Sequence, residues 1–424
     1  MKLQRKSVRA AAKENPISVL LVHRFYEPDV TTYSQMLAMI ADHLRADGFR
    51  VDVFTTQPGY NGIYDGPDLP KKRLEDGVSV HRAPIPGGST SIGRLVGGLI
   101  FGALLILRSA LPSRRYDVVM VSTVPPVLMG LCGLAAARLT GANLVYHCMD
   151  LYPEIAIASG HAPPGIVARV ARAIDSRTIA RSAKTVVLSE DMRQTIAARG
   201  APVENTHVQN NFTIDSFEPD VSPRVGLPVD LQPTDRFRLL FAGNVGRFQG
   251  LPELIAGFAL DRERSESADT ELVFLGAGAA REQLRQQAEH LGITNFVRFV
   301  DHQPLEVAME AMKAADLAVV SLGPELIRSA YPSKTVMYLE MGCRILAIVE
   351  EDSELANLVA DNRLGTTAQP GDVEAIADAI QNERERLVCE GDGERARTLA
   401  SRHFAAETVL PQWSDLMRSI GQDR

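Results

Sequence analysis

Glycines that directly follow short apolar runs are the residues of this chain with the clearest chemistry. In the stretch 238–255, RLLFAGNVGRFQGLPELI, the apolar run Leu239–Phe241 is followed by Gly243, Asn244 and Gly246 and then by apolar residues at helical spacing. This pattern predicts a strand, a Gly-rich turn and a helix. Glycines let a backbone approach a ligand, and the free N–H groups of a helix N-terminus attract anions. Because any doubly wound domain contains such turns, this one alone is compatible with a structural role or with phosphate binding.

Two more turns of the same kind follow. In ELVFLGAGAAREQL a strand ends at Gly276 and Gly278 and a helix comes next, and the strand Leu317–Leu322 leads through a loop to Ser333, Lys334 and another helix. Ser333 is a plausible N-cap, and Lys334 adds a cation to the same helix end. Ligands of open parallel sheets bind along the carboxyl edge of the strands, where three such turns would lie together. A nucleoside diphosphate fits that edge.

Length and composition restrict the class of protein. A chain of 424 residues is too long for one core and indicates two domains, while 45% apolar and 23% charged residues are ordinary for a soluble globular protein. A net charge of -7 gives no argument for nucleic acid as a partner. The four cysteines lack metal-ligand spacing and are expected to be reduced thiols. The first residues lack the apolar core of a signal peptide, so the cytoplasm is the expected compartment.

The N-terminal half alternates strands and helices. ISVLLVH opens it, and further strands are expected in VSVHRAP, YDVVMVSTVPP, NLVYHCMD and KTVVLSEDM. The loop from Tyr26 to Thr32 follows the first strand and should face a substrate, so that Tyr26 and the hydroxyls of Thr31 and Thr32 are candidates for acceptor contacts. Both halves of the chain are therefore predicted to be α/β, with doubly wound parallel sheets.

Two segments of this half carry features of a membrane surface. Residues 1–15 form a basic arm with Lys2, Arg5, Lys6, Arg9 and Lys13 and no acid before residue 14. The arm is either a solvated terminus or a segment resting on anionic lipid. The run Leu95–Leu107 contains thirteen consecutive apolar or glycine residues. At 1.5 Å per residue it reaches about 20 Å, short of the roughly 30 Å hydrocarbon core. The segment 92–111 is thus either a core helix or a helix lying in the membrane interface.

The remaining organisation follows from composition. Residues 213–236 carry four prolines among Asp and Ser and are predicted to be a linker between an N-terminal domain, 1–212, and a C-terminal domain, 237–400. The end of the chain, 401–424, is predicted to be a helix that packs back toward the N-terminal domain.

The set of motifs in this order resembles the two-Rossmann GT-B fold of family 4 glycosyltransferases. Within that family it is similar to the bacterial subgroup that builds O-antigen, capsule and exopolysaccharide, including the L-fucosamine transferase type. The resemblance covers 17–420 and rests on FYEPDVTT, STVPPVLMG, YHCMDLYPEIA, QNNF, FAGNVGRFQGL, FLGAGAAREQL, VRFVDH and YPSKTVMYLEMG. Each motif is weak alone, whereas their common order is specific.

The resemblance implies a transferase that binds a nucleotide sugar, a UDP-sugar in particular, in the C-terminal domain and an acceptor in the N-terminal domain. Transfer would retain the anomeric configuration and need no metal, with preorganised donors stabilising the departing diphosphate. It implies that Gly243, Asn244 and Gly246 approach the donor, that Gly276 and Gly278 lie near it, that Ser333 and Lys334 hold the diphosphate, and that 298–302 borders the base.

The chain departs from the family pattern in the donor site. The Arg and Lys frequent in the first turn are replaced by Asn244 and Gln249, which leaves the positive charge to Lys334 and Arg247. The frequent pair of glutamates eight residues apart is missing as well. Its positions are occupied by Ser329 and Met337, and Glu340 comes three residues late. These departures weaken the roles that the resemblance gives to single residues. They do not weaken the resemblance to the glycosyltransferase class.

Candidates for chemistry on the acceptor lie in MDLYPEIA, at a predicted strand end. Asp150 or Glu154 could orient or deprotonate an acceptor hydroxyl. Alternatively, Asp150 caps a turn and Glu154 is a solvated helix residue. His147 is a weaker candidate, because strand alternation does not decide whether it faces the cleft or the core. His23, at the end of the first strand, has the same ambiguity and favours a structural role.

The functional hypothesis is a retaining glycosyltransferase acting in cell-surface polysaccharide synthesis. Enzymes of the family that this chain resembles often use undecaprenyl-diphosphate-linked acceptors. A lipid-linked glycan and an anionic membrane surface are therefore the expected partners. The protein is expected to be peripheral on the inner face of the cell membrane. Two alternatives are a UDP-sugar 2-epimerase on the same fold and a sugar-nucleotide-binding subunit without catalysis.

Overall fold

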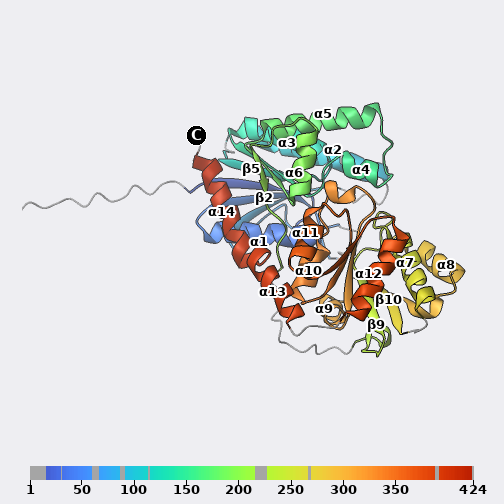
Figure 1. Ribbon diagram of the computed structural model, residues 1–424. Coiled ribbons are helices and arrows are strands. Elements are labelled where there is room, and N and C mark those ends of the chain that lie inside the picture. The colour runs from blue at the N-terminus through green and yellow to red at the C-terminus, as the bar shows by residue number, and fades with distance from the viewer. Residues whose placement is uncertain are drawn as a thin grey trace, which may run out of the picture.

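The computed structural model describes residues 16–29, 31–59, 66–85, 91–112, 115–214, 227–265, 269–386 and 391–422. The basic arm predicted at 1–15 lies outside these residues. Figure 1 shows two α/β halves, each with a central sheet between layers of helices. This arrangement confirms the predicted fold class, two doubly wound α/β sheets in one chain.

The N-terminal sheet has eight strands in the order β3-β4-β2-β1-β5-β6-β7-β8. Neighbouring strands are parallel, except that β3 is antiparallel to β4. The strands are β1 (Ser18–Val22), β2 (Arg50–Thr56), β3 (Lys72–Glu75), β4 (Val78–Ala83), β5 (Val118–Ser122), β6 (Asn143–Cys148), β7 (Lys184–Val187) and β8 (Thr206–Val208).

The helices of this half are α1 (Thr32–Ala46), α2 (Ser91–Ser109), α3 (Leu128–Thr140), α4 (Glu154–Ala158), α5 (Ile166–Arg181) and α6 (Glu190–Ala198). Alternate residues of β1 enter different cores, because successive side chains of a strand point to opposite faces. Val19 and Leu21 pack with α1, whereas Leu20 and Val22 pack with α2 and α3. The sheet is thus buried on both faces, as expected of parallel strands.

The C-terminal sheet has six parallel strands in the order β11-β10-β9-β12-β13-β14. They are β9 (Phe237–Ala242), β10 (Thr270–Leu275), β11 (Val297–Val300), β12 (Leu317–Ser321), β13 (Ile345–Ile348) and β14 (Gly365–Ala368). The helices are α7 (Leu251–Arg264), α8 (Arg281–His290), α9 (Leu305–Lys313), α10 (Lys334–Glu340), α11 (Glu354–Asp361), α12 (Val373–Glu385), α13 (Asp392–His403) and α14 (Ala406–Gln422). Short 3-10 helices lie at η2 (Val229–Leu231), η3 (Thr294–Phe296) and η4 (Leu326–Arg328).

The last helix, α14, leaves the C-terminal half and packs on the N-terminal half beside α1 (Figure 1). The Trp413 ring lies 4.9 Å from the His147 ring, and the Asn143 side chain donates to the Ile420 carbonyl at 2.8 Å. The other crossing between the halves comes earlier in the chain, before β9. There the Thr213 N–H donates to the Phe404 carbonyl at 2.8 Å. The two crossings therefore lie side by side.

The end of the predicted linker is packed rather than free. Leu231 is fully buried, and the Arg238 guanidinium donates to the carbonyls of Leu231 and Gln232 while its Nε bonds to Glu271 at 2.6 Å. A buried arginine needs such partners because an unpaired buried charge is costly. The domain boundaries predicted from composition stay a prediction. Within the described residues, no helix is both long enough and apolar enough to cross a bilayer.

Candidate active site

The Gly-rich turns after β9 and β10 pack backbone against backbone. The Gly243 N–H donates to the Leu275 carbonyl at 2.8 Å, and the Val245 N–H donates to the Ala277 carbonyl at 2.9 Å. A Cβ atom on Gly276 would lie 2.1 Å from the Gly243 oxygen, and one on Gly278 would lie 2.1 Å from the Val245 oxygen. Gly276 and Gly278 are therefore required by the contact between the two turns, whether or not they also touch a ligand.

Within the first turn, the predicted donor residues differ in what they contact. The Gln249 side chain is engaged locally, because its Oε1 accepts the Gly246 N–H at 2.9 Å. Asn244 and Arg247 are exposed on the surface of the turn. Helix α7 begins directly after Gly250, which has φ +58, and directs its first N–H groups toward this turn. The N–H groups of Gly243, Val245 and Gly246 are thus used within the fold, and Asn244 and Arg247 are the exposed polar side chains of the turn.

Lys334 is the most unusual residue of this edge. Its Nζ is buried, lies 3.3 Å from the centre of the Phe241 ring, and has no hydrogen-bond partner among the described residues. A Cβ added to Gly243 would lie 3.8 Å from the same Nζ, so the ammonium sits beside the glycine turn. Burial lowers the pKa of Lys334 well below its ordinary value, because loss of water disfavours the charged form. An anion placed here would restore the charged state.

Ser333 and Glu340 are two other predicted donor-site residues at the ends of α10. Ser333 occupies the N-cap position, but it has helical backbone angles and makes no side-chain cap hydrogen bond, so the predicted capping role is wrong. Its exposed hydroxyl remains available at the helix end. Glu340 is the last residue of α10 and lies about 9 Å along the axis from Lys334 at 1.5 Å per residue. Arg298, predicted near the base, pairs instead with Asp230 and Glu271 at the beginning of the strands.

The loop of Asp150 meets the loop before Lys334 across the two halves. Asp150 and Ala330 form an antiparallel β-bridge, and the Leu151 N–H donates to the Ser329 carbonyl at 2.8 Å. A second contact lies between the His161 and Phe248 rings, whose centres are 4.3 Å apart. The acceptor-side loop is therefore held directly against the two loops that form the donor edge.

The Asp150 carboxylate suits proton transfer better than any other predicted acceptor-side group. Burial raises its pKa to about 6, because a desolvated carboxylate is harder to ionise. Burial alone accounts for this shift, and no side-chain hydrogen bond of Asp150 is found among the described residues. A general base is most effective when its pKa lies near the working pH.

Glu154 is engaged in an ion-pair network instead. Its carboxylate pairs with Arg199 and accepts from Arg172 Nε at 2.7 Å. Arg199 also bonds to Asp175 at 2.7 Å and to the Tyr152 carbonyl at 3.1 Å, and thereby fixes the segment that follows Asp150. These contacts favour a structural role for Glu154, since a base must reach the proton it removes.

The two histidines predicted near the acceptor belong to a buried aromatic cluster. The Tyr33 hydroxyl and His147 Nδ1 are 2.9 Å apart, and His23 Nδ1 lies 2.5 Å from the Ser122 hydroxyl. Burial lowers the pKa of His23 and of His147 to about 3, so both imidazoles are neutral. The structure thus corrects the cleft assignment of His147: its ring packs between Tyr33 and Trp413 in the core.

The β1–α1 loop is likewise mostly structural. Tyr26 is buried, which raises the pKa of its phenol. The Thr31 hydroxyl accepts from the Ser34 N–H at 3.0 Å and caps α1. Thr32 is the exposed one of the three and remains accessible at the first turn of α1. Tyr26 is thus buried, Thr31 is half-buried and used as a cap, and Thr32 is exposed.

Sequence reasoning missed a contact between two helix N-termini. The Glu190 N–H of α6 donates to Glu354 at 2.5 Å, and the Glu354 N–H of α11 donates to Asp191 at 2.9 Å. Arg328 of η4 pairs with Asp191 at 2.9 Å, and its carbonyl accepts from Thr195 at 2.7 Å. Each carboxylate thus caps the other half's helix. The acidic first turns were visible in the sequence, but their partners lie more than 130 residues away.

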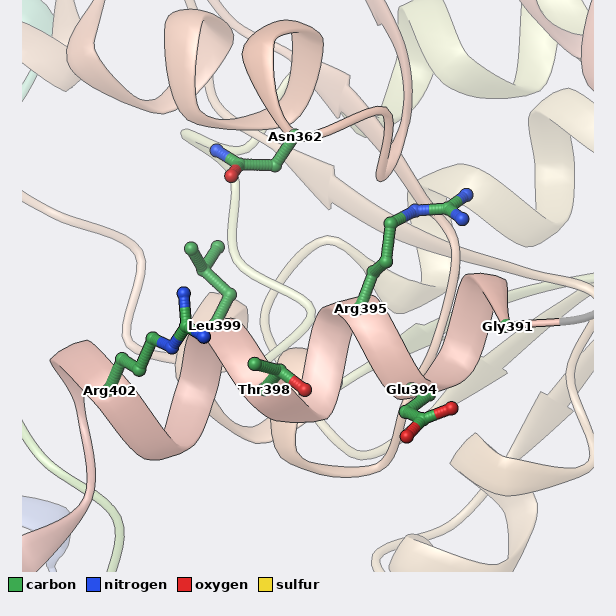
Figure 2. A pocket seen from close by; sticks show the side chains of 7 residues that line it. All are labelled: Asn362, Gly391, Glu394, Arg395, Thr398, Leu399 and Arg402. Carbon is green, nitrogen blue, oxygen red and sulfur yellow. The ribbon is translucent and has the colours of Figure 1, made fainter.

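A hollow of about 400 Å³ lies elsewhere, along α13. Figure 2 shows Arg395, Thr398, Leu399 and Arg402 on that helix with Asn362 opposite. Asn362 precedes β14, so this hollow lies at the amino edge of the sheet, opposite the edge that holds Lys334. It contains none of the predicted site residues. In the described residues, no cluster of His, Cys, Asp or Glu has the arrangement of a metal site.

Comparison with known proteins agrees with this architecture. A model of the glycosyl transferase 4-like domain matches residues 31–211, and a model of glycosyl transferases group 1 matches residues 236–383. The chain is 23% identical to the probable glycosyltransferase WbjE of Pseudomonas aeruginosa over 339 residues, 78% of this chain and 81% of WbjE.

Solved structures show the same fold. Anabaena HepE in complex with UDP superposes with a TM-score of 0.65 at 16% identity, covering 95% of this chain and all of that one, 100%. WaaG, a glycosyltransferase involved in lipopolysaccharide biosynthesis, superposes with a TM-score of 0.64 at 17% identity, covering 94% of this chain and 99% of that one. The chain therefore belongs to the family 4 glycosyltransferases, with a 4-like N-terminal domain and a group 1 C-terminal domain, and it is a GT-B enzyme that transfers a sugar from a nucleotide.

Proposed function

We propose that this enzyme binds a UDP-sugar with its diphosphate at Lys334 and the Gly243 turn. The observation that carries this proposal is the buried Lys334 Nζ, which has no hydrogen-bond partner among the described residues and lies beside the turn. A buried ammonium without an acceptor is costly unless a ligand supplies one. The diphosphate supplies charge-assisted hydrogen bonds there, while the first N–H groups of α7 add further donors. HepE was solved with UDP, which supports uracil as the base.

A thermal-shift series tests the donor site. UDP, GDP and ADP are added to the wild type, to Lys334→Met and to Lys313→Met, a lysine at the end of α9 that pairs with Glu310. A nucleotide at about 100 times its Kd stabilises the native state by roughly 2.7 kcal/mol. We expect a UDP shift in the wild type and in Lys313→Met and none in Lys334→Met. An unchanged UDP shift in Lys334→Met contradicts the proposed site.

For the transfer itself, Asp150 orients or deprotonates the acceptor hydroxyl, and the product retains the anomeric configuration. Lys334 and the backbone N–H groups stabilise the departing diphosphate, a role that a metal ion plays in other enzymes. Activity that survives exhaustive treatment with EDTA supports metal independence. Nuclear magnetic resonance of the product's anomeric proton tests retention.

The proposed acceptor is a lipid-linked glycan, in particular one carried on undecaprenyl diphosphate, and the process is the synthesis of a cell-surface polysaccharide. The similarity to WbjE and the shared fold with WaaG, a glycosyltransferase involved in lipopolysaccharide biosynthesis, support this class. The motif order resembles that of the L-fucosamine transferase type. Transfer of labelled sugar from UDP-sugars to the solvent-extracted lipids of a polysaccharide-producing bacterium tests it. Label that appears only in water-soluble products contradicts a lipid acceptor.

A further inference from the structure

Helix α2 carries large apolar residues on its outer side as well as on its inner side, where Phe101 and Leu105 are fully buried. Gly97, Gly98 and Gly102 face inward, and a Cβ atom on Gly98 would lie 2.8 Å from Pro125 and one on Gly102 would lie 2.6 Å from Cys132. Leu95 is 61% exposed and Leu107 is 65% exposed. Val96, Leu99 and Ile100 are exposed on the same outer side. A helix facing water carries polar residues on its outer side, so the outer side of α2 suits an apolar environment.

The apolar surface continues onto the neighbouring helices. α2 packs against α3, and α3 packs against α5; Figure 1 shows the three helices together on one side of the N-terminal half. Leu131 of α3 is exposed, and at the beginning of α5 Ile166 is 71% and Val167 is 84% exposed, with Val170 beside them. Contiguous exposed apolar patches of this kind mark interaction sites.

The patch borders the carboxyl edge of the sheet. Helices α2 and α5 precede β5 and β7, and α3 follows β5, so the first turns of all three lie at the edge where the strands end. Gly98 packs on Pro125, in the turn directly after β5. Asp150, which follows β6, lies at the same edge. The surface formed by Leu95, Val96, Leu99, Ile100, Leu131, Ile166, Val167 and Val170, here called the apolar face, is therefore adjacent to the candidate active site.

Charge on these helices is one-sided. Together α2, α3 and α5 contain seven arginines, no lysine and a single acid, Asp175, in a chain whose net charge is -7. Asp175 is buried and paired with Arg199, so it does not offset the surface charge. Arg169 is exposed between the apolar residues Val167 and Val170 of α5, whereas Arg138, Arg177 and Arg181 are exposed toward the far ends of α3 and α5. Arginines at the rim of an apolar surface can place their stems in the membrane interface and their charges at the phosphates.

We infer that the apolar face docks on an anionic lipid bilayer, with α2 lying in the interface and the first turn of α5 inserted beside it. A two-fold contact with a second copy is disfavoured, because each copy would bring the same arginines against the other's. Interfacial helices insert about 5–10 Å, which the Leu95, Leu99 and Val167 side chains can reach without crossing the membrane. The observations thus favour lipid over protein as the occupant.

This docking deepens the proposed function and rests on it for the acceptor. With the apolar face on the bilayer, the carboxyl edge that holds Asp150 lies at headgroup level. A glycan attached to a membrane-embedded lipid through a diphosphate would then present its sugar to that edge without leaving the membrane. The sequence predicted only the helix at 92–111 as a membrane-interface segment. The residues that α3 and α5 add to the apolar face go beyond that prediction.

Vesicle flotation of the full-length protein tests the inference, with phosphatidylcholine vesicles containing or lacking 30% phosphatidylglycerol at low salt. The variant Leu99→Glu/Val167→Glu places two charges in the apolar face. Val229→Glu, at an equally exposed apolar residue of η2 in the other half, is the matched control. We expect the wild type and the control to bind anionic vesicles, and the double variant to lose at least tenfold in its partition coefficient. Wild-type protein that floats with neither vesicle, or a double variant that floats like the wild type, overturns the inference.

Two further measurements separate this result from other causes. A dimeric wild type that becomes monomeric in the double variant would assign the apolar face to self-association and overturn the lipid assignment. The UDP-induced thermal shift and transfer to a water-soluble acceptor with a short alkyl tail should be unchanged in the double variant. Deletion of residues 2–13 should weaken flotation less than the double variant does, because it leaves the apolar face intact.

Discussion

The two carboxyl edges that meet in this enzyme are built in different ways. At the donor edge, the predicted residues come together from neighbouring turns, and Lys334 keeps a buried Nζ with no hydrogen-bond partner among the described residues. At the acceptor edge, most predicted polar residues are engaged in packing: Glu154 with two arginines, His147 under Trp413, and Thr31 as a helix cap. Asp150 is the exception. The donor site is thus assembled by local motifs, whereas the acceptor site depends on which polar groups the fold leaves unused.

The largest expected effect lies at the donor edge. Lys334→Met should lower kcat/KM by about 10²- to 10³-fold, the loss typical for removal of one preorganised donor to developing charge. The same variant should be more stable than the wild type near neutral pH, because it removes the cost of burying a cation. Steady-state kinetics and thermal unfolding without nucleotide measure the two effects.

The pH dependence checks the cause of that stabilisation. Because burial lowers the pKa of Lys334 from its ordinary value of 10.5, the unfolded chain binds more protons than the folded one between the lowered pKa and 10.5, and wild-type stability rises with pH in that window. The advantage of Lys334→Met should therefore shrink as the pH approaches 10.5. If the stability gain of Lys334→Met over the wild type is the same at all pH values, its cause is packing against Phe241 and not the charge of Lys334.

The next effect distinguishes the two acceptor-side carboxylates. Asp150→Asn should reduce kcat by about 10²- to 10⁴-fold, as expected for loss of a general base, with UDP affinity unchanged. Since the base must be ionised, wild-type activity should fall as the pH is lowered through about 6. A pH–rate profile of the wild type and UDP titration of the variant provide the measurements. If the residual activity of Asp150→Asn still falls as the pH is lowered through about 6, the titrating group is a residue other than Asp150.

Glu154→Gln is the matched comparison for Asp150→Asn. It should leave kcat within a few-fold of the wild type while lowering the stability, because Arg172 and Arg199 each lose one charged partner. Arg199→Leu should cost more, about 3–5 kcal/mol, since it leaves the buried Asp175 without a countercharge. Urea unfolding measures both. A large drop in kcat with unchanged stability for Glu154→Gln would reverse the roles given to these two carboxylates.

The smallest effect concerns the contact between the halves. Arg328→Gln removes ion pairs to Asp191 and Asp352, but it keeps the backbone contacts and leaves an amide that can still donate to Asp191, so it should cost about 1 kcal/mol of stability. We expect UDP affinity within about twofold of the wild type and a several-fold higher KM for the acceptor, because the Ser329–Ala330 strand that pairs with Asp150 is less firmly held. Arg193→Gln, whose ion pair with Glu190 stays within α6, is the control. Equal effects of both variants on the acceptor KM would remove Arg328 from the acceptor site.

Local pattern predicted much of the fold and part of the site. The strand-turn-helix units around Gly243, Gly276 and Lys334 were readable because their residues are close in sequence and their chemistry resides largely in the backbone. The environment of His147 was not readable, because a strand residue's face depends on which helices cover it, and here the cover is Trp413 of the last helix. Glu154 also could not be assigned, since its main partner Arg199 lies 45 residues away in sequence. The basic arm and the domain boundaries remain predictions.

The sequence by itself determined the α/β class, the order of the elements and the position of the Gly-rich turns, because hydrophobic period and glycine placement act over a few residues. Only the tertiary structure decided which carboxylate stays free, why Gly276 and Gly278 must lack side chains, and which side of α2 faces outward. Those properties depend on contacts between segments far apart in the chain, and burial and charge pairing are set by those contacts rather than by residue type.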